Sequence, residues 1–535
     1  MQHVFIEYVY LVLAILALVT FADIAKVAYP IVLVIGGLAL SFLSEFSDMT
    51  IDPSVVLFIF LPPLLYEAAW QTSFKEFWKW KRVITSMAFP IVIITACVIA
   101  FFSSAIIPGF TLALGFLLGG IISPPDAISA TTIMRQVNAP KTLVSIAEGE
   151  SLLNDASSLI IYRFALAAVI TGQFYFVEAT SSFFLVVIMG IVFGLGVGYI
   201  FYVIHRWLPI PPRIEIIMTF VTPYCMFYAA EHFQFSGVLA VVSGGLLLSS
   251  KRQQMLSYRS RIQAGNVWTS IVFVLNGLIF LLIGLQLPVI INQLGDISLV
   301  KATWYGIAIS FVLMITRILC TLGASAFTMF MSRYITVADP NPGWKGPLIL
   351  GWAGMRGVVS LAAALSIPLY ISDTQMFPYR NLILFITFIV ILVTLVFQGL
   401  TLPLLIKWLK VEETTAVKSD IEQEKLIQKK LSQSSFLYLE NKFTSEGLDN
   451  DHITNLRLRF ELEFRFFDSE LLEDVDPAQK NTIQEYHNTY LDLLDHQRNL
   501  LKEINHDAQF DEELIRKYYA LIDFEELKIR EQFMQ

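Results

Sequence analysis

Four carboxylates stand close together in a stretch of the chain that is otherwise strongly apolar. Asp126 directly follows the run Ser123-Pro124-Pro125, and residues 148–155 read Glu-Gly-Glu-Ser-Leu-Leu-Asn-Asp. Burying a carboxylate at the centre of a bilayer costs at least ~2.5 kcal/mol, so ionisable residues inside membrane segments usually mark a functional site. The pattern therefore favours a site that binds charge over a soluble loop in which Asp155 would only cap a helix.

The residue types around Asp155 are those that bind a small monovalent cation. Hard cations prefer oxygen ligands. Asp155 would supply the negative charge, and Ser151, one turn earlier on the same helical face, would supply a hydroxyl oxygen. Asp126 and the carbonyls freed by Pro124 and Pro125 would approach from a second helix. Because a carboxylate also accepts a proton, one site would hold either a proton or a metal ion, and this competition would couple the two fluxes.

Composition divides the chain into a membrane domain and a soluble tail. The 535 residues are 56% hydrophobic and 15% charged, and long apolar runs recur as far as Leu409. Residues 1–410 carry 22 Lys and Arg against 17 Asp and Glu, a net charge of +5, whereas residues 411–535 carry 15 against 28, a net charge of −13. We therefore predict a transmembrane domain over 1–410 and an acidic, mainly helical cytoplasmic tail over 411–535.

Thirteen hydrophobic segments are predicted as membrane-spanning helices. Their approximate ranges are 4–20, 29–46, 54–70, 83–107, 110–134, 143–171, 180–204, 214–231, 236–250, 265–286, 302–332, 346–370 and 379–409. Counted from an external N-terminus, fifteen Lys and Arg fall in loops on one side of the membrane and two on the other. Since cytoplasmic loops are enriched in basic residues, this places the N-terminus outside and the tail in the cytoplasm of a multi-pass plasma-membrane protein.

Two of these segments are interrupted in the middle. The fifth contains Pro124 and Pro125, which lack the N–H that a helix needs, and the twelfth contains Gly354 and Gly357 around Arg356. The breaks lie seven segments apart, as they would in two inverted six-helix repeats joined by one linking helix. Paired broken helices of this kind point to the binding site of a secondary transporter. We predict an all-α polytopic membrane protein of about 13 transmembrane helices in two inverted repeats, with broken helices that cross.

The motifs around these residues resemble those of the monovalent cation:proton antiporter-1 family, which includes sodium/proton antiporters of bacteria, archaea and animals. The resemblance spans residues 5–410 or so. It rests on four motifs in order: Leu61-Pro62-Pro63-Leu64-Leu65-Tyr66-Glu67, Ser123-Pro124-Pro125-Asp126, Glu150-Ser151-Leu152-Leu153-Asn154-Asp155 and Gly354-Met355-Arg356-Gly357.

The resemblance implies a homodimeric transporter that exchanges sodium, or else lithium or potassium, for protons. It also implies an elevator-like movement of a six-helix core against a dimerising scaffold. Asp155 would carry the ion or the proton, with Ser151, Asn154 and Asp126 beside it. Asn154 implies electroneutral exchange, because electrogenic relatives have a second aspartate there. One departure is Pro125, which stands where the family usually has Thr or Ser, so a hydroxyl ligand is lost.

Two arginines within the apolar segments need acidic partners, because an unpaired buried charge is costly. The resemblance pairs Arg317 with Glu150 and Arg356 with Glu67. Both pairs are expected to be structural.

Other classes of protein fit the sequence less well. A cation channel would share pore carboxylates but would not need paired breaks in repeated units. An intramembrane enzyme would need a base for Ser151, and the neighbouring apolar segments contain no His. A sensor whose tail is its output would need an output motif, and the tail has no phosphate-binding glycine loop. We therefore interpret the protein as an exchanger for pH homeostasis with a regulatory tail. Its expected partners are a monovalent cation, protons and the lipid bilayer, without a cofactor or nucleic acid; a tail-regulated potassium/proton exchanger stays open.

Overall fold

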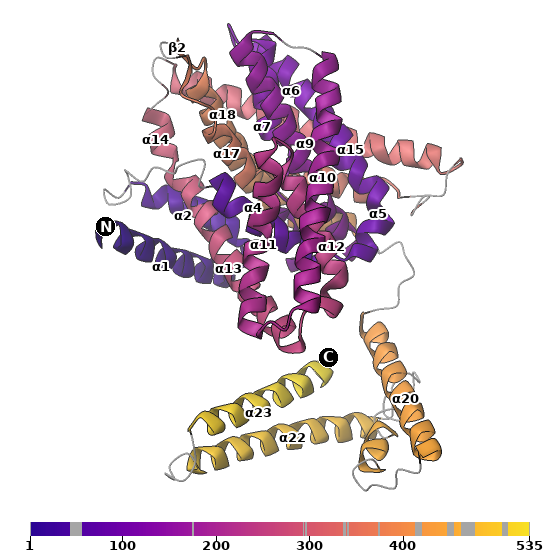
Figure 1. The fold of residues 1–535 in the computed structure, drawn as a ribbon. Coiled ribbons are helices and arrows are strands. Elements are labelled where there is room, and N and C mark those ends of the chain that lie inside the picture. Colours follow the sequence, from indigo (N-terminus) through magenta and orange to yellow (C-terminus); the bar gives the residue numbers. More distant parts are fainter. Residues whose placement is uncertain are drawn as a thin grey trace. The chain divides into compact units, whose positions relative to one another are not determined.

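The computed structural model describes residues 2–42, 56–173, 176–292, 294, 297–334, 339, 342–372, 375–411, 420–446, 454–461, 477–504 and 512–533. Nearly all of these residues are helical (Figure 1). The α-helices are α1 (Gln2–Ala25), α2 (Tyr29–Leu40), α4 (Leu61–Gln71), α5 (Phe74–Ser86), α6 (Val92–Ile106), α7 (Leu112–Ile122), α8 (Ala127–Gln136), α9 (Lys141–Thr171), α10 (Phe176–Trp207), α11 (Pro212–His232), α12 (Gly237–Met255), α13 (Tyr258–Leu285), α14 (Leu287–Asn292), α15 (Leu299–Met331), α16 (Lys345–Trp352), α17 (Val358–Leu365), α18 (Arg380–Val393), α19 (Gly399–Leu409), α20 (Asp420–Glu446), α22 (Pro477–Ile504) and α23 (Glu512–Phe533).

The described residues also form three short π-helical turns and one small hairpin, and residues 454–461 are helical. The π-helical turns are η1 (Val56–Phe60), η2 (Met87–Ile91) and η3 (Thr394–Gln398). Strands β1 (Tyr370–Ser372) and β2 (Gln375–Met376) form an antiparallel pair between α17 and α18. The hairpin is a small departure from the predicted all-α fold.

The chain forms two compact units, Met1–Thr414 and Thr415–Gln535. Within the described part of the first unit, seven helical stretches are long and apolar enough to cross a membrane. They are Phe74–Ile106, Leu112–Gln136, Lys141–Thr171, Ser181–Trp207, Arg259–Ile291, Leu299–Met331 and Arg380–Leu409. The protein is therefore a multi-pass membrane protein. All thirteen predicted segments contain helical residues, although the exact number of spans stays a prediction.

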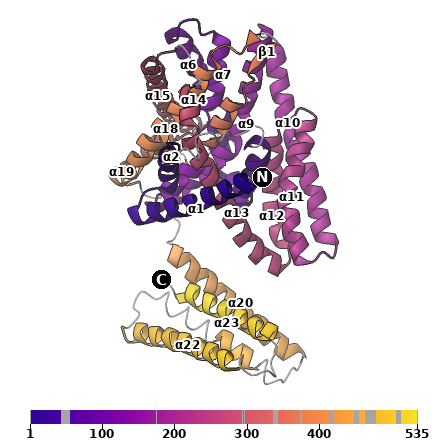
Figure 2. The same ribbon diagram turned by 90° about the vertical axis from the view of Figure 1, so that its left-hand side faces the viewer.

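Contacts divide the helices of the first unit into two groups. In one group, α10, α11 and α12 pack on one another and on α4, while α1, α2 and α13 pack together. In the other group, α5 to α9 pack among themselves and against α15 to α19. Figure 2 shows α10, α11 and α12 along one edge of this unit and α15, α18 and α19 at the opposite edge. The carboxylate-rich helix α9 and both interrupted segments belong to the second group.

Glycines let the first half of the fifth segment pack tightly between its neighbours. A Cβ atom at Gly115 or Gly119 of α7 would lie 2.5 Å from a backbone carbonyl oxygen of α6. On the other side, a Cβ at Gly120 would lie 2.9 Å from the backbone nitrogen of Tyr162 in α9. Small residues of this kind allow close approach of membrane helices, which gain van der Waals contact in the absence of a hydrophobic driving force. This packing holds α7 directly against α9.

Candidate functional site

The two predicted breaks are present, and they meet. The fifth segment is helical as far as Ile122 and again from Ala127, and the twelfth is helical as far as Trp352 and again from Val358. The backbone N–H of Asp126 donates a hydrogen bond of 2.6 Å to the carbonyl of Met355, which joins one break to the other.

Gly357 is required where the breaks touch. A Cβ atom at this position would lie 2.5 Å from Oδ2 of Asp126, which is too close for any larger residue without displacing the carboxylate. The glycine thus explains how two irregular segments can cross at the level of the carboxylates.

Arg356 holds the crossing together from within. Its side chain is fully buried. The guanidinium donates from Nε to the carbonyl of Ile122 (2.9 Å), from Nη2 to that of Ser123 (3.2 Å) and from Nη1 to that of Gly354. The first two are carbonyls left unpaired where α7 ends, and that helix end carries partial negative charge. Arg356 is therefore neutralised by the ends of broken helices.

The predicted pair of Glu67 with Arg356 is wrong. Glu67 is half-buried on α4, where its carboxylate accepts a hydrogen bond of 2.5 Å from Nε2 of Gln71. No ion pair joins it to Arg356 among the described residues. The physical reason is that carbonyl groups at the crossing, which sequence does not count as charges, already satisfy the guanidinium.

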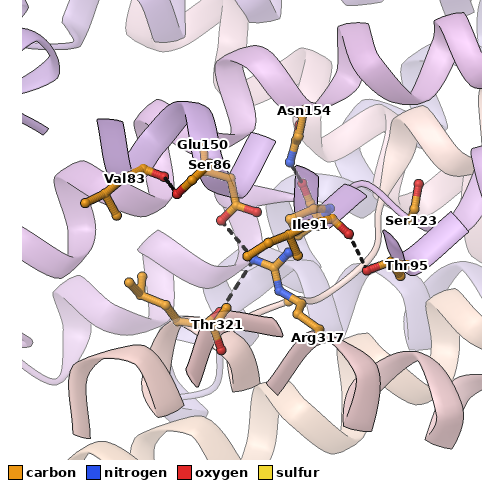
Figure 3. A network of polar contacts seen from close by, with 12 residues as sticks. Val83, Ser86, Ile91, Thr95, Ser123, Glu150, Asn154, Arg317 and Thr321 are labelled. Carbon is orange, nitrogen blue, oxygen red and sulfur yellow. Dashed lines mark hydrogen bonds and ion pairs between the residues drawn. The ribbon is translucent and has the colours of Figure 1, made fainter. Parts of the chain in front are cut away.

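The predicted pair of Glu150 with Arg317 is confirmed. Arg317 Nη2 lies 2.8 Å from Glu150 Oε2, and the two side chains are 3% and 2% exposed (Figure 3). Arg317 also packs against the second break, because a Cβ at Gly354 would lie 2.3 Å from Cδ of Arg317. The same Cβ would lie 2.9 Å from Nη1 of Arg356. Two buried arginine side chains therefore lie against the side of Gly354 where a Cβ would stand, so a glycine is needed at this position.

Asp155 lies on α9 beside the crossing. Its side chain is 6% exposed, and among the described residues none donates a hydrogen bond to its carboxylate. The preceding residue, Asn154, is fully buried and donates from Nδ2 to the carbonyl of Pro125 at 3.0 Å. This bond ties α9 to the first break. It also means that one carbonyl freed by the prolines is bound by an amide of the protein.

Asp126 is held as the N-cap of α8. Its Oδ1 accepts the backbone N–H of Ile128 (3.1 Å), and its Oδ2 accepts the hydroxyl of Ser129 (2.8 Å). The preceding residue, Pro125, accepts the hydrogen bond from Asn154, so Asp126 and Asp155 each stand next to one end of that contact. Asp126 is thus fixed in place by a cap, with lone pairs left for a further ligand.

The predicted residues are therefore brought together in part. Asp155, Asp126 and Asn154 meet at the crossing, and Ser151 lies one turn before Asp155 on the same helix, partly exposed. Such a set of carboxylate, hydroxyl and carbonyl oxygens suits a hard monovalent cation. Within the described part of the chain, no three His, Cys, Asp or Glu side chains group as a site for a multivalent metal would.

Several polar residues that support the site were not singled out from the sequence. Thr394, in the π-helical turn η3, accepts the backbone N–H of Arg356 at 3.1 Å. Ser157 and Ser158 follow Asp155 and donate to the carbonyls of Ala88 and Gly120, each at 2.6 Å. These hydroxyls fix α9 against η2 and α7. A hydroxyl residue within an apolar segment indicates a buried hydrogen bond, and this could have drawn attention to the three residues. The sequence does not show which carbonyl or N–H group each of them binds.

Comparison with known proteins places this architecture among cation/proton exchangers. The profile of the family described as "Sodium/hydrogen exchanger, transmembrane" matches residues 11–408. An uncharacterised Na+/H+ exchanger of Mycobacterium tuberculosis is 29% identical over 94% of this chain and 92% of its own length. The "Sodium, potassium, lithium and rubidium/H(+) antiporter" of Bacillus pumilus is 31% identical over 83% of this chain and 69% of its own.

A solved structure shares the fold. The sodium proton antiporter MjNhaP1 of Methanocaldococcus jannaschii superimposes with a TM-score of 0.59 at 17% identity, over 77% of this chain and 100% of that protein. At this level of identity the likeness concerns the arrangement of helices.

Proposed function

The chain belongs to the sodium/hydrogen exchanger family, and from that premise we propose that it exchanges sodium, or lithium or potassium, for protons, with Asp155 binding either ion. The environment of the Asp155 carboxylate is the main support for this assignment. Asp155 is buried beside the crossing of two broken helices, yet none of the described residues donates a hydrogen bond to its carboxylate. A buried carboxylate without a donor is costly unless a proton or a cation neutralises it.

The remaining residues of the site have separate roles in this proposal. Asp126 and Ser151 provide further oxygen ligands for the cation. Asn154 fixes the position of Asp155 by holding the carbonyl of Pro125. Because Asp155 is the one carboxylate that exchanges its ion, a single monovalent cation replaces a single proton and transport moves no net charge.

The division of the helices supports transport by alternating access. The group that contains α9 and both breaks, with six of the thirteen predicted spans, would move as one core. The group of α1, α2, α4 and α10 to α13 would be the scaffold and would form the interface of a homodimer. If the helices form two inverted repeats, both breaks would lie at the middle of the bilayer. In this proposal the protein lies in the plasma membrane, with the N-terminus outside, and serves pH homeostasis.

The test is transport by purified protein in proteoliposomes that contain a pH-sensitive dye. Sodium, lithium and potassium are added in turn, with the membrane potential either free or clamped. The Asp155→Asn variant should lose cation-driven proton movement to background while remaining folded. The matched control is Glu148→Gln, which removes a carboxylate of the same helix that pairs with Arg135 at the edge of the domain, and it should retain exchange.

Two results would contradict the proposal. Substantial exchange by Asp155→Asn would remove the residue from its assigned role. A rate that changes clearly when the potential is clamped would refute electroneutral exchange, while leaving the antiport itself in place.

The tail, residues 411–535, is proposed to regulate transport. The second compact unit of the chain, Thr415–Gln535, contains α20, α22 and α23. The tail carries most of the acidic residues of the chain. Truncation after Lys410 should change the pH profile or the maximal rate of exchange, measured in the same vesicles, with the oligomeric state intact. Unchanged kinetics would instead favour a solubilising or dimerising appendage.

A further inference from the structure

A cavity of about 720 Å³ lies between the ends of α5, α9, α15 and α16. Its lining contains neither Asp155 nor Asp126. Buried apolar side chains form its inner part, namely those of Trp80, Met87, Leu143, Ile146 and Leu350. Exposed basic side chains form its rim, namely those of Lys79, Arg82, Lys345 and Lys410, against one acidic residue, Asp339. The cavity is therefore apolar inside and positively charged at its mouth.

Two helix N-termini in the lining add to the positive potential. The helix α9 begins after Pro140 and α16 begins after Trp344, and neither has a side-chain cap. The first turn of each helix therefore carries partial positive charge. Together with Lys345 and Lys410, which form no ion pair with a described residue, they favour an anion with hydrogen-bond acceptors.

We propose that this cavity binds an anionic phospholipid, with the phosphate at the basic rim and the acyl chains along the apolar wall. Large aromatic side chains beside it, Phe327, Phe330 and Trp344, are more than half exposed at the ends of α15 and α16. Exposed aromatics at the ends of apolar spans mark the level of the lipid headgroups. Basic pockets between membrane helices at that level suit anionic headgroups.

The lining connects the lipid to the elements of the transport domain. The carbonyl of Leu350 accepts a hydrogen bond of 3.5 Å from Arg317, the partner of Glu150. Thr321, also in the lining, has its hydroxyl 2.6 Å from where a Cβ at Gly351 would stand. An occupant therefore braces α15 against α16. Because a ligand that binds the folded state stabilises it by mass action, occupancy raises the melting temperature.

The experiment measures thermal unfolding of the full-length protein in an uncharged detergent. Short-chain phosphatidylglycerol is titrated against phosphatidylcholine with the same chains and against inorganic phosphate. Lys345→Gln combined with Lys410→Gln removes two rim charges, while Arg213→Gln combined with Lys407→Gln removes two exposed charges that do not line the cavity. We expect saturable stabilisation by phosphatidylglycerol, and the rim variant should require a roughly thirtyfold higher concentration, about fivefold for each charge. The matched variant should behave as the wild type.

Three outcomes would overturn the proposal. These are equal stabilisation by the two lipids, unchanged response of the rim variant, and full stabilisation by inorganic phosphate at the same concentration, which would make the cavity a site for a free anion. If the rim variant does not fold, Lys345→Gln and Lys410→Gln are tested one at a time, because each removes a single rim charge. Each should require a roughly fivefold higher concentration of phosphatidylglycerol, and unchanged binding would equally overturn the proposal.

Discussion

Arginine meets carboxylates in both compact units, but in opposite environments. In the membrane unit, Arg317 contacts a single carboxylate at 2.8 Å, and both side chains are almost fully buried. In the second unit, Arg498 contacts Asp495 and Asp523, each at 2.8 Å, and also Glu526, while it stays 25% exposed and the two aspartates 70% and 66% exposed. Water and salt screen the exposed cluster. One buried contact should therefore matter more to folding than three exposed ones.

Arg356 shows a further way to bury an arginine, without an acidic partner. Its guanidinium binds the carbonyls of Ile122, Ser123 and Gly354. The three arginines thus differ in burial and in partner. Arg356 is fully buried and binds carbonyls, Arg317 is buried and binds one carboxylate, and Arg498 is partly exposed and binds three carboxylates. This difference in burial predicts that Arg356 contributes most to the stability of the folded protein, Arg317 less and Arg498 least.

Arg356→Gln should have the largest effect. It leaves the carbonyls of both breaks without their donor, and each buried unsatisfied group costs ~1–3 kcal/mol, so the loss should reach several kcal/mol. Exchange should fall to background because the crossing is no longer fixed. Arg356→Lys should not restore either property, since an ammonium group cannot reproduce the planar fork of a guanidinium. Thermal unfolding and antiport of the purified protein measure both effects.

Glu67→Gln is the matched control for this prediction. Because Glu67 does not neutralise Arg356 here, the variant should lose less than about 1 kcal/mol of stability. Severe destabilisation by Glu67→Gln would indicate that Glu67 does neutralise Arg356. Near-normal stability of Arg356→Gln would show that the carbonyls at the breaks do not need the guanidinium.

Arg317→Ala comes next in size. Removing one partner of a buried pair typically costs ~3–5 kcal/mol, because the other charge is left unpaired. Glu150→Ala should cost a similar amount, and the double variant should lose clearly less than the sum, as coupled residues do. Arg135→Ala, which breaks the exposed pair with Glu148, should cost about 1 kcal/mol or less. Additive losses, or a stable Arg317→Ala with altered cation affinity, would show that the pair is not structural.

The partners of these residues differed in how far the sequence could predict them. Proline and glycine chemistry is local, so both breaks were predicted correctly. The formal charge of Arg317 indicated that it needs an acidic partner, while its pairing with Glu150 followed from the family resemblance. The partners of Arg356 could not be predicted, because partial charges arise only once α7 ends at a particular carbonyl. The bond from Asn154 to Pro125 and the support of Arg356 by Thr394 likewise depend on which helices cross. The sequence thus indicated which residues form the site, while their mutual contacts required the fold.

The tail cluster should show the smallest effect, and it should depend on pH in one direction. Hydrogen bonds from Arg530 and Arg498 lower the pKa of Glu526 below its ordinary value of 4.5. The unfolded tail therefore takes up this proton at a higher pH than the folded tail does. The stabilisation from Glu526 is complete above pH 4.5 and is lost as the pH falls through the lower pKa of the folded state. Between pH 8 and pH 6, no loss from this group is expected.

Hydrogen exchange of α22 and α23 in the full-length protein tests this last prediction. Arg498→Gln should lower protection of the two helices by about 1 kcal/mol or less at neutral pH, because exposed ion pairs are screened. The matched variant Lys429→Gln changes a basic residue of α20, outside the cluster, and should leave α22 and α23 unaffected. A loss of several kcal/mol on Arg498→Gln would contradict the comparison itself, since three exposed contacts would then contribute as much as the single buried pair of Arg317 with Glu150.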